Sequence, residues 1–281
     1  SRRRCPHRRR LMQGGRAVRI LFVGDVVGKT GRLAVRRRLP VLRKQLEADL
    51  VIVNGENAAG GAGLTPDTAD EIFAAGADVI TMGNHTWDQK ELLPYLDRNP
   101  RIIRPLNLPP GLPGRGWVTV ETPAGRAAVL NLLGRVFLNI SPDDPFRAAD
   151  EAVARIRERT PVIVVDFHAE ATSEKQALGW YLDGRVTAVI GTHTHVQTAD
   201  GRVLPGGTGY VTDAGMTGAR DSVIGFDRET IIRRFLTQRP VRFELAGGDA
   251  VLSAVLLHCD PATGRCLDLR AFTEVVSDPA G

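Results

Sequence analysis

VTAVIGTHTH, residues 186–195, is a short apolar run that ends at Gly191 and is followed by two histidines. The apolar run predicts a buried β-strand. If the chain stays extended beyond it, alternate side chains point the same way, so His193 and His195 face one site. Imidazole pairs of this kind are typical metal ligands, although a surface His-x-His pair without a metal remains an alternative at this point.

The same arrangement recurs at four earlier positions, where a buried-looking run is followed by polar residues. The runs cover residues 18–23, 50–53, 78–81 and 161–167. A parallel sheet brings the carboxyl ends of its strands to one edge, where one or two ligands from each strand can gather around a pair of metal ions. The candidate metal ligands are Asp25, Glu56, Asn57, Asn84, His168, His193 and His195.

Several of these side chains also have ordinary structural explanations. Asp25 is suited to capping the next helix, an Asn-His pair is common in turns, and His168 could be a hydrogen-bonded structural histidine. Asp88 lies three residues after His85, where it could orient that ring or cap a helix. The clustering at strand ends favours a metal site. In such a site the neighbouring imidazole of His85 could protonate a leaving alkoxide.

The glycine-rich stretch from Gly24 to Thr30 resembles a phosphate-binding loop but lacks a required glycine. The nucleotide-binding pattern needs glycine five positions before Gly28, and Val23 stands there. The sequence therefore argues against a nucleoside-triphosphatase and in favour of a two-metal hydrolase acting on phosphate esters.

Alternating strands and helices predict an α/β protein with mostly parallel pairing. Helices are expected over residues 31–48, from 65–66 onward, and over 88–96, 145–159 and 173–182. Antiparallel segments at 117–121 and 126–133 indicate a mixed sheet, or two packed sheets flanked by helices. The C-terminal part is predicted to be mostly β, with strands at 210–212, 231–235, 241–245, 251–258 and 266–272. Residues 18–281 are assigned to a single domain.

Composition limits the possible partners. The 281 residues are 43% hydrophobic with a net charge of +5, and no apolar run is long enough for a membrane span. Residues 1–17 hold seven arginines and no acid; without them, 30 Lys+Arg face 32 Asp+Glu, a net charge of −2. The basic extension is either a nucleic-acid or membrane arm or a dispensable segment. The body does not predict DNA binding.

The three cysteines, Cys5, Cys259 and Cys266, argue against a disulfide framework and for a reducing cytoplasm. His258-Cys259 together with Cys266 could be half a zinc site. The preferred interpretation is that the two cysteines lie on neighbouring β-strands.

Taken together, the motifs resemble the calcineurin-like metallophosphoesterase superfamily. Its pattern runs Asp-x-His, Gly-Asp-x-x-Asp, Gly-Asn-His, a lone His and Gly-His-x-His. This chain has Val27 in place of the first His and Glu56 in place of the bridging Asp, and both departures match the YmdB-like bacterial metallophosphoesterases. The matching stretches are GDVVGKTGR (24–32), NGENAAGGAGLT (54–65), ITMGNHTWDQKE (80–91), DFHAEATSEK (166–175), GTHTHVQTAD (191–200) and TDAGMTGARDSVIG (212–225).

The resemblance implies a four-layer αββα fold and two divalent metal ions, Fe or Mn with Mg also considered. Hydroxide activated by both metals would hydrolyse phosphodiesters such as 2′,3′-cyclic nucleotides, with His85 as the general acid. Glu56 would bridge the metals. The first metal would be held by Asp25, Asn57 and His195, and the second by Asn84, His168 and His193.

Other functions remain open at this point. They are a phosphomonoesterase or nucleotidase of broad specificity, and a regulatory protein with residual activity. Thr194, Arg220 and Ser222 are the candidate substrate contacts. A homo-oligomer is expected from the base rate for soluble proteins.

Overall fold

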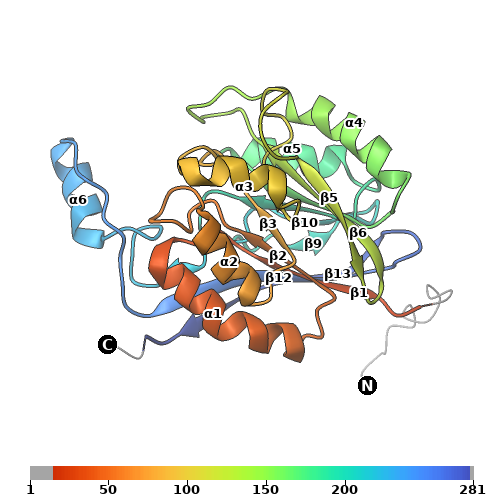
Figure 1. Ribbon diagram of the computed structural model, residues 1–281, viewed down its shortest axis with the longest axis horizontal. Helices are drawn as coiled ribbons and strands as arrows, with labels where there is room; N and C mark the ends of the chain where they lie inside the picture. The colour runs from red at the N-terminus through yellow and green to blue at the C-terminus, as the bar shows by residue number, and fades with distance from the viewer. Residues whose placement is uncertain (1–14, 279–281) are drawn as a thin grey trace, which may run out of the picture.

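The computed structural model describes residues 15–278, which form two mixed β-sheets (Figure 1). The first has the strand order β11-β12-β1-β2-β3-β4, with β13 also paired to β12. Its strands are β1 (Val18–Val23), β2 (Leu50–Asn54), β3 (Val79–Thr81), β4 (Ile102–Ile103), β11 (Gly218–Ala219), β12 (Ala250–Cys259) and β13 (Cys266–Val276). The strands β1 to β4 are parallel, and β12 runs antiparallel to β1.

The second sheet has the order β5-β6-β7-β8-β10-β9. Its central strands β6, β7, β8 and β10 are parallel, while β5 and β9 at the two edges are antiparallel to their neighbours. The bounds are β5 (Trp117–Thr122), β6 (Gly125–Leu133), β7 (Ile163–His168), β8 (Ala188–Thr192), β9 (Arg202–Val203) and β10 (Gly209–Val211).

Strand periodicity divides the apolar side chains into three layers. In β1, Leu21 and Val23 face the helices on the outside of the first sheet, whereas Ile20 and Phe22 enter the layer between the sheets. The second sheet likewise has an inner apolar face and an outer one packed against helices. The central parallel strands β2, β7 and β8 are buried on both faces and are nearly continuous apolar runs, as expected for covered parallel sheets.

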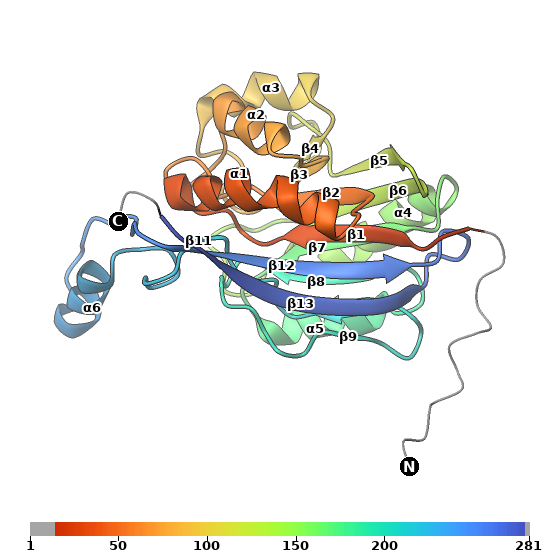
Figure 2. The same cartoon turned by 90° about the horizontal axis from the view of Figure 1, so that it is seen from below.

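Helices cover the two outer faces (Figures 1 and 2). On the first sheet lie α1 (Gly28–Gln45), α2 (Pro66–Ala74), the short 3₁₀ helix η1 (Lys90–Leu92) and α3 (Leu93–Arg98). On the second lie α4 (Pro145–Arg157) and α5 (Thr172–Tyr181). The layers are therefore helix, sheet, sheet, helix, and the predicted four-layer αββα architecture is confirmed.

The predicted strand at residues 231–235 is wrong, because these residues lie in helix α6 (Arg228–Thr237). The side chain of Asp227 accepts the backbone N–H of Thr230 and caps this helix. The helix stands away from the body of the protein (Figures 1 and 2), with Phe235 and Leu236 exposed. The strand predicted at 241–245 is also wrong, since its residue Leu245 makes an isolated bridge to Phe226.

Other sequence predictions concern the ends of the chain and membrane insertion. The basic extension at residues 1–17 lies, except for its last three residues, outside the described part of the chain. The division into this extension and one domain over 18–281 stays a prediction. Within residues 15–278, no helix is long and apolar enough to cross a membrane.

Candidate metal centre

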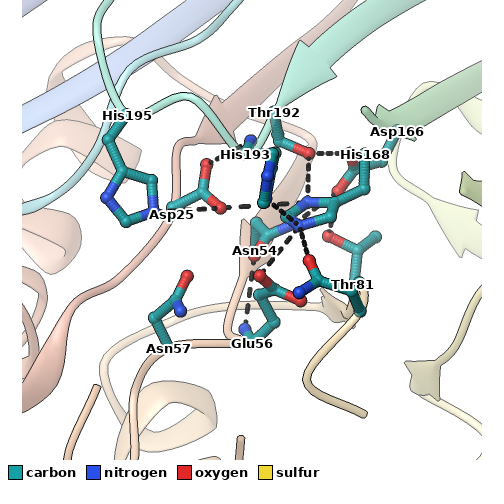
Figure 3. Close-up of polar contacts among 12 residues, drawn as sticks. Asp25, Asn54, Glu56, Asn57, Thr81, Asp166, His168, Thr192, His193 and His195 are labelled. Carbon is teal, nitrogen blue, oxygen red and sulfur yellow. Dashed lines mark hydrogen bonds and ion pairs between the residues drawn. The ribbon is translucent and has the colours of Figure 1, made fainter. Parts of the chain in front are cut away.

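The candidate ligands come together where the carboxyl ends of both sheets meet (Figure 3). Asp25 follows β1, Glu56 and Asn57 follow β2, and Asn84 follows β3. From the second sheet, His168 ends β7, and His193 and His195 follow β8. Neither sheet alone could supply this set, so the packing of the two sheets creates the site.

Half of the cluster is centred on the Nε2 atom of His168. It lies 2.8 Å from Glu56 Oε1, 3.0 Å from Asn84 Oδ1 and 3.1 Å from His193 Nδ1. One ring nitrogen can donate at most one hydrogen bond, so it cannot satisfy these three neighbours. The arrangement is that of ligand atoms around a shared ion.

The protonation of His168 follows from the residues behind it. The hydroxyl of Thr192 donates its single proton to Asp166 Oδ1 at 2.6 Å, so it must accept from His168 Nδ1 at 2.8 Å. In the neutral ring, Nε2 then carries a lone pair. This lone pair faces Glu56 Oε1, Asn84 Oδ1 and His193 Nδ1. Acceptor atoms grouped in this way are stable when a cation lies among them.

The other two histidines are tethered in a similar way. His193 Nε2 contacts Glu170 Oε2 at 2.8 Å, which favours the tautomer with its proton on Nε2 and leaves Nδ1 free to ligate. His195 Nδ1 donates to the carbonyl oxygen of Ile224 at 2.9 Å, leaving Nε2 as the lone-pair atom. That nitrogen lies 3.8 Å from Asp25 Oδ1, beyond hydrogen-bonding distance.

Three buried side-chain oxygens have no hydrogen-bond partner among the described residues: Asp25 Oδ1, Glu56 Oε1 and Asn57 Oδ1. Glu56 Oε1 is near His168 Nε2 but outside hydrogen-bonding geometry. The Asn57 amide donates to the Gly61 carbonyl oxygen at 3.0 Å, which fixes its own oxygen on the side of Asp25 and His195 (Figure 3). Buried acceptors without partners are costly, and carboxylate, amide and imidazole ligands suit divalent metal ions. The residues present therefore fit a metal centre.

The electrostatics of the cluster also favour bound positive charge. Burial alone would lower the pKa of His168, but the Glu56 carboxylate raises it to about 9. Conversely, burial would raise the pKa of Glu56, and His168 lowers it to about 2. Burial, followed by the His168 charge, lowers the pKa of His193 to about 3. A metal ion and a proton would therefore compete for the Nε2 atom of His168.

His85 lies at the edge of the cluster, with its side chain about one-third exposed. Its backbone N–H donates to Glu56 Oε2 at 3.1 Å, and its Nδ1 lies 2.7 Å from Asp88 Oδ2. Of the two roles considered for Asp88, orientation of the His85 ring therefore matches the structure. With Nδ1 donating to Asp88, the Nε2 atom of His85 carries a transferable proton when both ring nitrogens are protonated.

Gly83 is required because a side chain there would collide with the ligands. A Cβ atom at this position would lie 2.2 Å from Glu56 Oε2 and 2.4 Å from His168 Nε2. We expect Gly83→Ala to lose bound metal and to cost about 1–3 kcal/mol of stability through overpacking. Metal content and thermal unfolding would measure both effects.

Gly247→Ala is the matched control, because a Cβ there meets no described atom within 4 Å. Full metal occupancy in Gly83→Ala would show that Glu56 and His168 can move apart without losing the site.

The three candidate substrate contacts differ in their surroundings. Thr194 donates its backbone N–H and its hydroxyl to Asp213 Oδ2. The Ser222 hydroxyl donates to the Ala219 carbonyl oxygen and accepts the N–H of Gly225, so both hydroxyls are engaged within the protein. Arg220 is exposed just beyond β11. The substrate role of all three stays a prediction.

Sequence reasoning missed Glu170 and Thr192, which contact the second ring nitrogens of His193 and His168, two of the candidate ligands. Their positions beside His168 and His193 were a possible indication, because histidine ligands are normally supported by a carboxylate, carbonyl or hydroxyl on the second ring nitrogen. Asp166 is not among the candidate ligands. It is fully buried and accepts hydrogen bonds from Asn54, Thr81 and Thr192, and burial raises its pKa to about 6.

The model of the YmdB-like protein family matches residues 21–272, nearly the whole described chain. The chain belongs to the YmdB-like family. The family expected from the motifs of the metal cluster is thus confirmed.

Individual relatives agree with the YmdB-like assignment. The chain is 53% identical over 253 residues to the 2′,3′-cyclic-nucleotide 2′-phosphodiesterase of Bacillus subtilis, covering 90% of this chain and 96% of that protein. A crystal structure of a novel phosphatase from Mycoplasma pneumoniae is 38% identical with a TM-score of 0.88, covering 95% and 96% of the two chains. A calcineurin-like phosphoesterase of B. subtilis shares the fold, at 13% identity and a TM-score of 0.59, over 94% and 91%.

Proposed function

We propose that this YmdB-like protein is a metal-dependent phosphodiesterase that hydrolyses 2′,3′-cyclic nucleotides. The observation that carries the proposal is the set of buried, unpartnered oxygens of Asp25, Glu56 and Asn57 facing imidazole nitrogens. The B. subtilis relative that bears this activity in its name is similar over nearly its whole length.

The proposed division of ligands follows the two halves of the cluster. Asn84, His168 and His193 would hold one ion, Asp25, Asn57 and His195 the other, with Glu56 between them. When bound, the two ions would orient the phosphate and activate the attacking water. Val27 stands where the superfamily has a histidine, so Asn57 would carry more of the binding on that side.

His85 would complete the reaction at the leaving group. Opening the cyclic diester at its 2′ bond releases a ribose oxygen that needs a proton. Asp88 would accept from His85 Nδ1 at 2.7 Å, and the doubly protonated imidazole would give its second proton, on Nε2, to that oxygen. Fe or Mn is the proposed pair, with Mg as a further choice, because the ligands combine nitrogen with hard oxygen atoms.

A broad phosphomonoesterase is the second candidate function, because the M. pneumoniae relative is described as a phosphatase. The motifs fix the chemistry of phosphate hydrolysis rather than the shape of the substrate pocket. We further propose a cytoplasmic location and a homo-oligomer, on the basis of the low cysteine count and of base rates respectively.

The decisive experiment measures hydrolysis of 2′,3′-cyclic AMP by protein loaded with Mn²⁺. We expect turnover that EDTA abolishes and that Mn²⁺ restores, with adenosine 3′-monophosphate as the product. Adenosine 2′- and 3′-monophosphate, offered in parallel, separate a diesterase from a phosphomonoesterase. Absence of cyclic-nucleotide turnover by protein shown to hold metal would contradict the proposed substrate.

A further inference from the structure

We propose that Asp213, paired with Lys175, is a positioning residue for the turn that carries His193 and His195. The inference rests on the proposed metal centre and gives a role to two residues of the matching stretches that were neither candidate ligands nor candidate substrate contacts. Asp213 lies just after β10, and Lys175 lies on α5. Both side chains are buried, at 0% and 1% exposure, and neither is a candidate metal ligand.

The turn after β8 adopts a backbone conformation that histidine rarely takes. His193 has a φ angle of 100° and His195 a φ of 69°, both in the region that favours glycine. Residues with such strained backbone angles persist where surrounding hydrogen bonds and packing hold them in place, and they cluster at functional sites. The departure from an extended strand also means that the two imidazoles reach the site through the turn rather than by simple alternation.

Asp213 supplies much of that constraint from behind the turn. Its Oδ2 atom accepts the backbone N–H of Thr194 at 3.0 Å and the Thr194 hydroxyl at 2.6 Å. Its Oδ1 atom accepts the N–H of Gly215 at 2.7 Å. The residue between the two histidines is therefore fixed through both its main chain and its side chain.

Lys175 completes the arrangement by donating to Asp213 Oδ2 at 2.9 Å. A buried ion pair gains little net stability over well-packed apolar residues, so burial of these two charges needs another reason. The position of the pair supplies that reason, because the Asp213 carboxyl group accepts four hydrogen bonds behind the turn and Lys175 supplies one of them. On the opposite side, Asp25 Oδ2 accepts the N–H of His193 at 3.2 Å, so two carboxylates hold the turn.

Asp213→Asn is the principal test. The asparagine amide accepts through its oxygen but donates through its NH2 group. The NH2 group would therefore face either the N–H of Gly215 or the donor groups of Thr194 and Lys175, and could not accept from them. We expect Mn²⁺ affinity, measured by titration calorimetry, to fall about 10- to 100-fold, as for other residues that orient metal ligands. The visible absorption spectrum of Co²⁺-loaded protein should also change, because the imidazole geometry changes.

Substitutions at Thr194 test the same contact while keeping both buried charges, in case Asp213→Asn does not fold. Thr194→Val removes the hydroxyl donor and should weaken Mn²⁺ binding. Thr194→Ser retains the donor and should bind Mn²⁺ with wild-type affinity. Equal affinities for the valine and serine variants would overturn the assigned role of the side-chain contact.

Asp183→Asn is the control for general destabilisation. Asp183 also accepts backbone N–H groups, from Gly206 and Thr208, but contacts none of the candidate ligands. If Asp183→Asn weakens Mn²⁺ binding as much as Asp213→Asn, or if folded Asp213→Asn binds like wild type, the positioning role is wrong. Failure of the wild-type protein to bind Mn²⁺ would instead refute the proposed metal centre.

Discussion

Replacing Glu56 with alanine is expected to abolish metal binding and phosphodiester hydrolysis together. Glu56 is 1% exposed, and its carboxylate lies 2.8 Å from His168 Nε2. It is the proposed bridge, so its removal takes a ligand from each ion. The remaining imidazoles would also lose the negative charge that attracts a cation, because Glu56 is the main charge that raises the pKa of His168 to about 9.

Metal content of the purified variant, together with turnover of 2′,3′-cyclic AMP, would measure both losses. Glu174→Ala is a suitable control, because this carboxylate on α5 accepts the N–H groups of Arg135 and Val136 outside the cluster. A Glu56→Ala protein that retains both ions would contradict the bridging role, whatever its activity.

Replacing His85 with alanine is expected to leave both metals bound and to lower kcat by about 10²- to 10⁴-fold, the usual contribution of a general acid. The substitution preserves the backbone N–H that donates to Glu56. Its effect should therefore fall on proton transfer rather than on the ligands.

The leaving group provides a sharper test of this role. A p-nitrophenyl diester releases an anion that needs no protonation, so its hydrolysis should suffer much less from His85→Ala than that of 2′,3′-cyclic AMP. Equal losses with both substrates would argue against a proton donor. Metal loss as large as that in Glu56→Ala would assign His85 to the structure of the site.

The general location of the site could be predicted because it depends on short apolar runs followed by polar residues. Each run forms a strand buried on both faces. Parallel pairing brings Asp25 and Glu56 to one edge of the first sheet and His168 to an edge of the second, and the packing of the two sheets joins them. What the sequence could not supply is the partner of each ring nitrogen. Ile224 holds His195 through a backbone carbonyl group, which any residue type could provide.

The errors in the fold have a related physical cause. Residues 231–235 contain apolar side chains that suit a strand, but Asp227 caps the segment as a helix that projects from the body. Local capping decided its structure, because few tertiary contacts competed with it. The conformation of His193 and His195 could not be predicted either, since it depends on hydrogen bonds from Thr194 to Asp213, 19 positions further along the chain.

The origin of the site in two separate sheets has a consequence for the folding of the protein. Asp25 and His193, which meet in one hydrogen bond, are 168 positions apart in sequence. Bringing residues so far apart in sequence together costs chain entropy, so contacts of this range slow folding. An ion shared by both sheets would crosslink the finished protein and raise its unfolding free energy by about 2.7 kcal/mol at a free concentration 100 times its dissociation constant. Capture of metal would therefore mark the completion of folding.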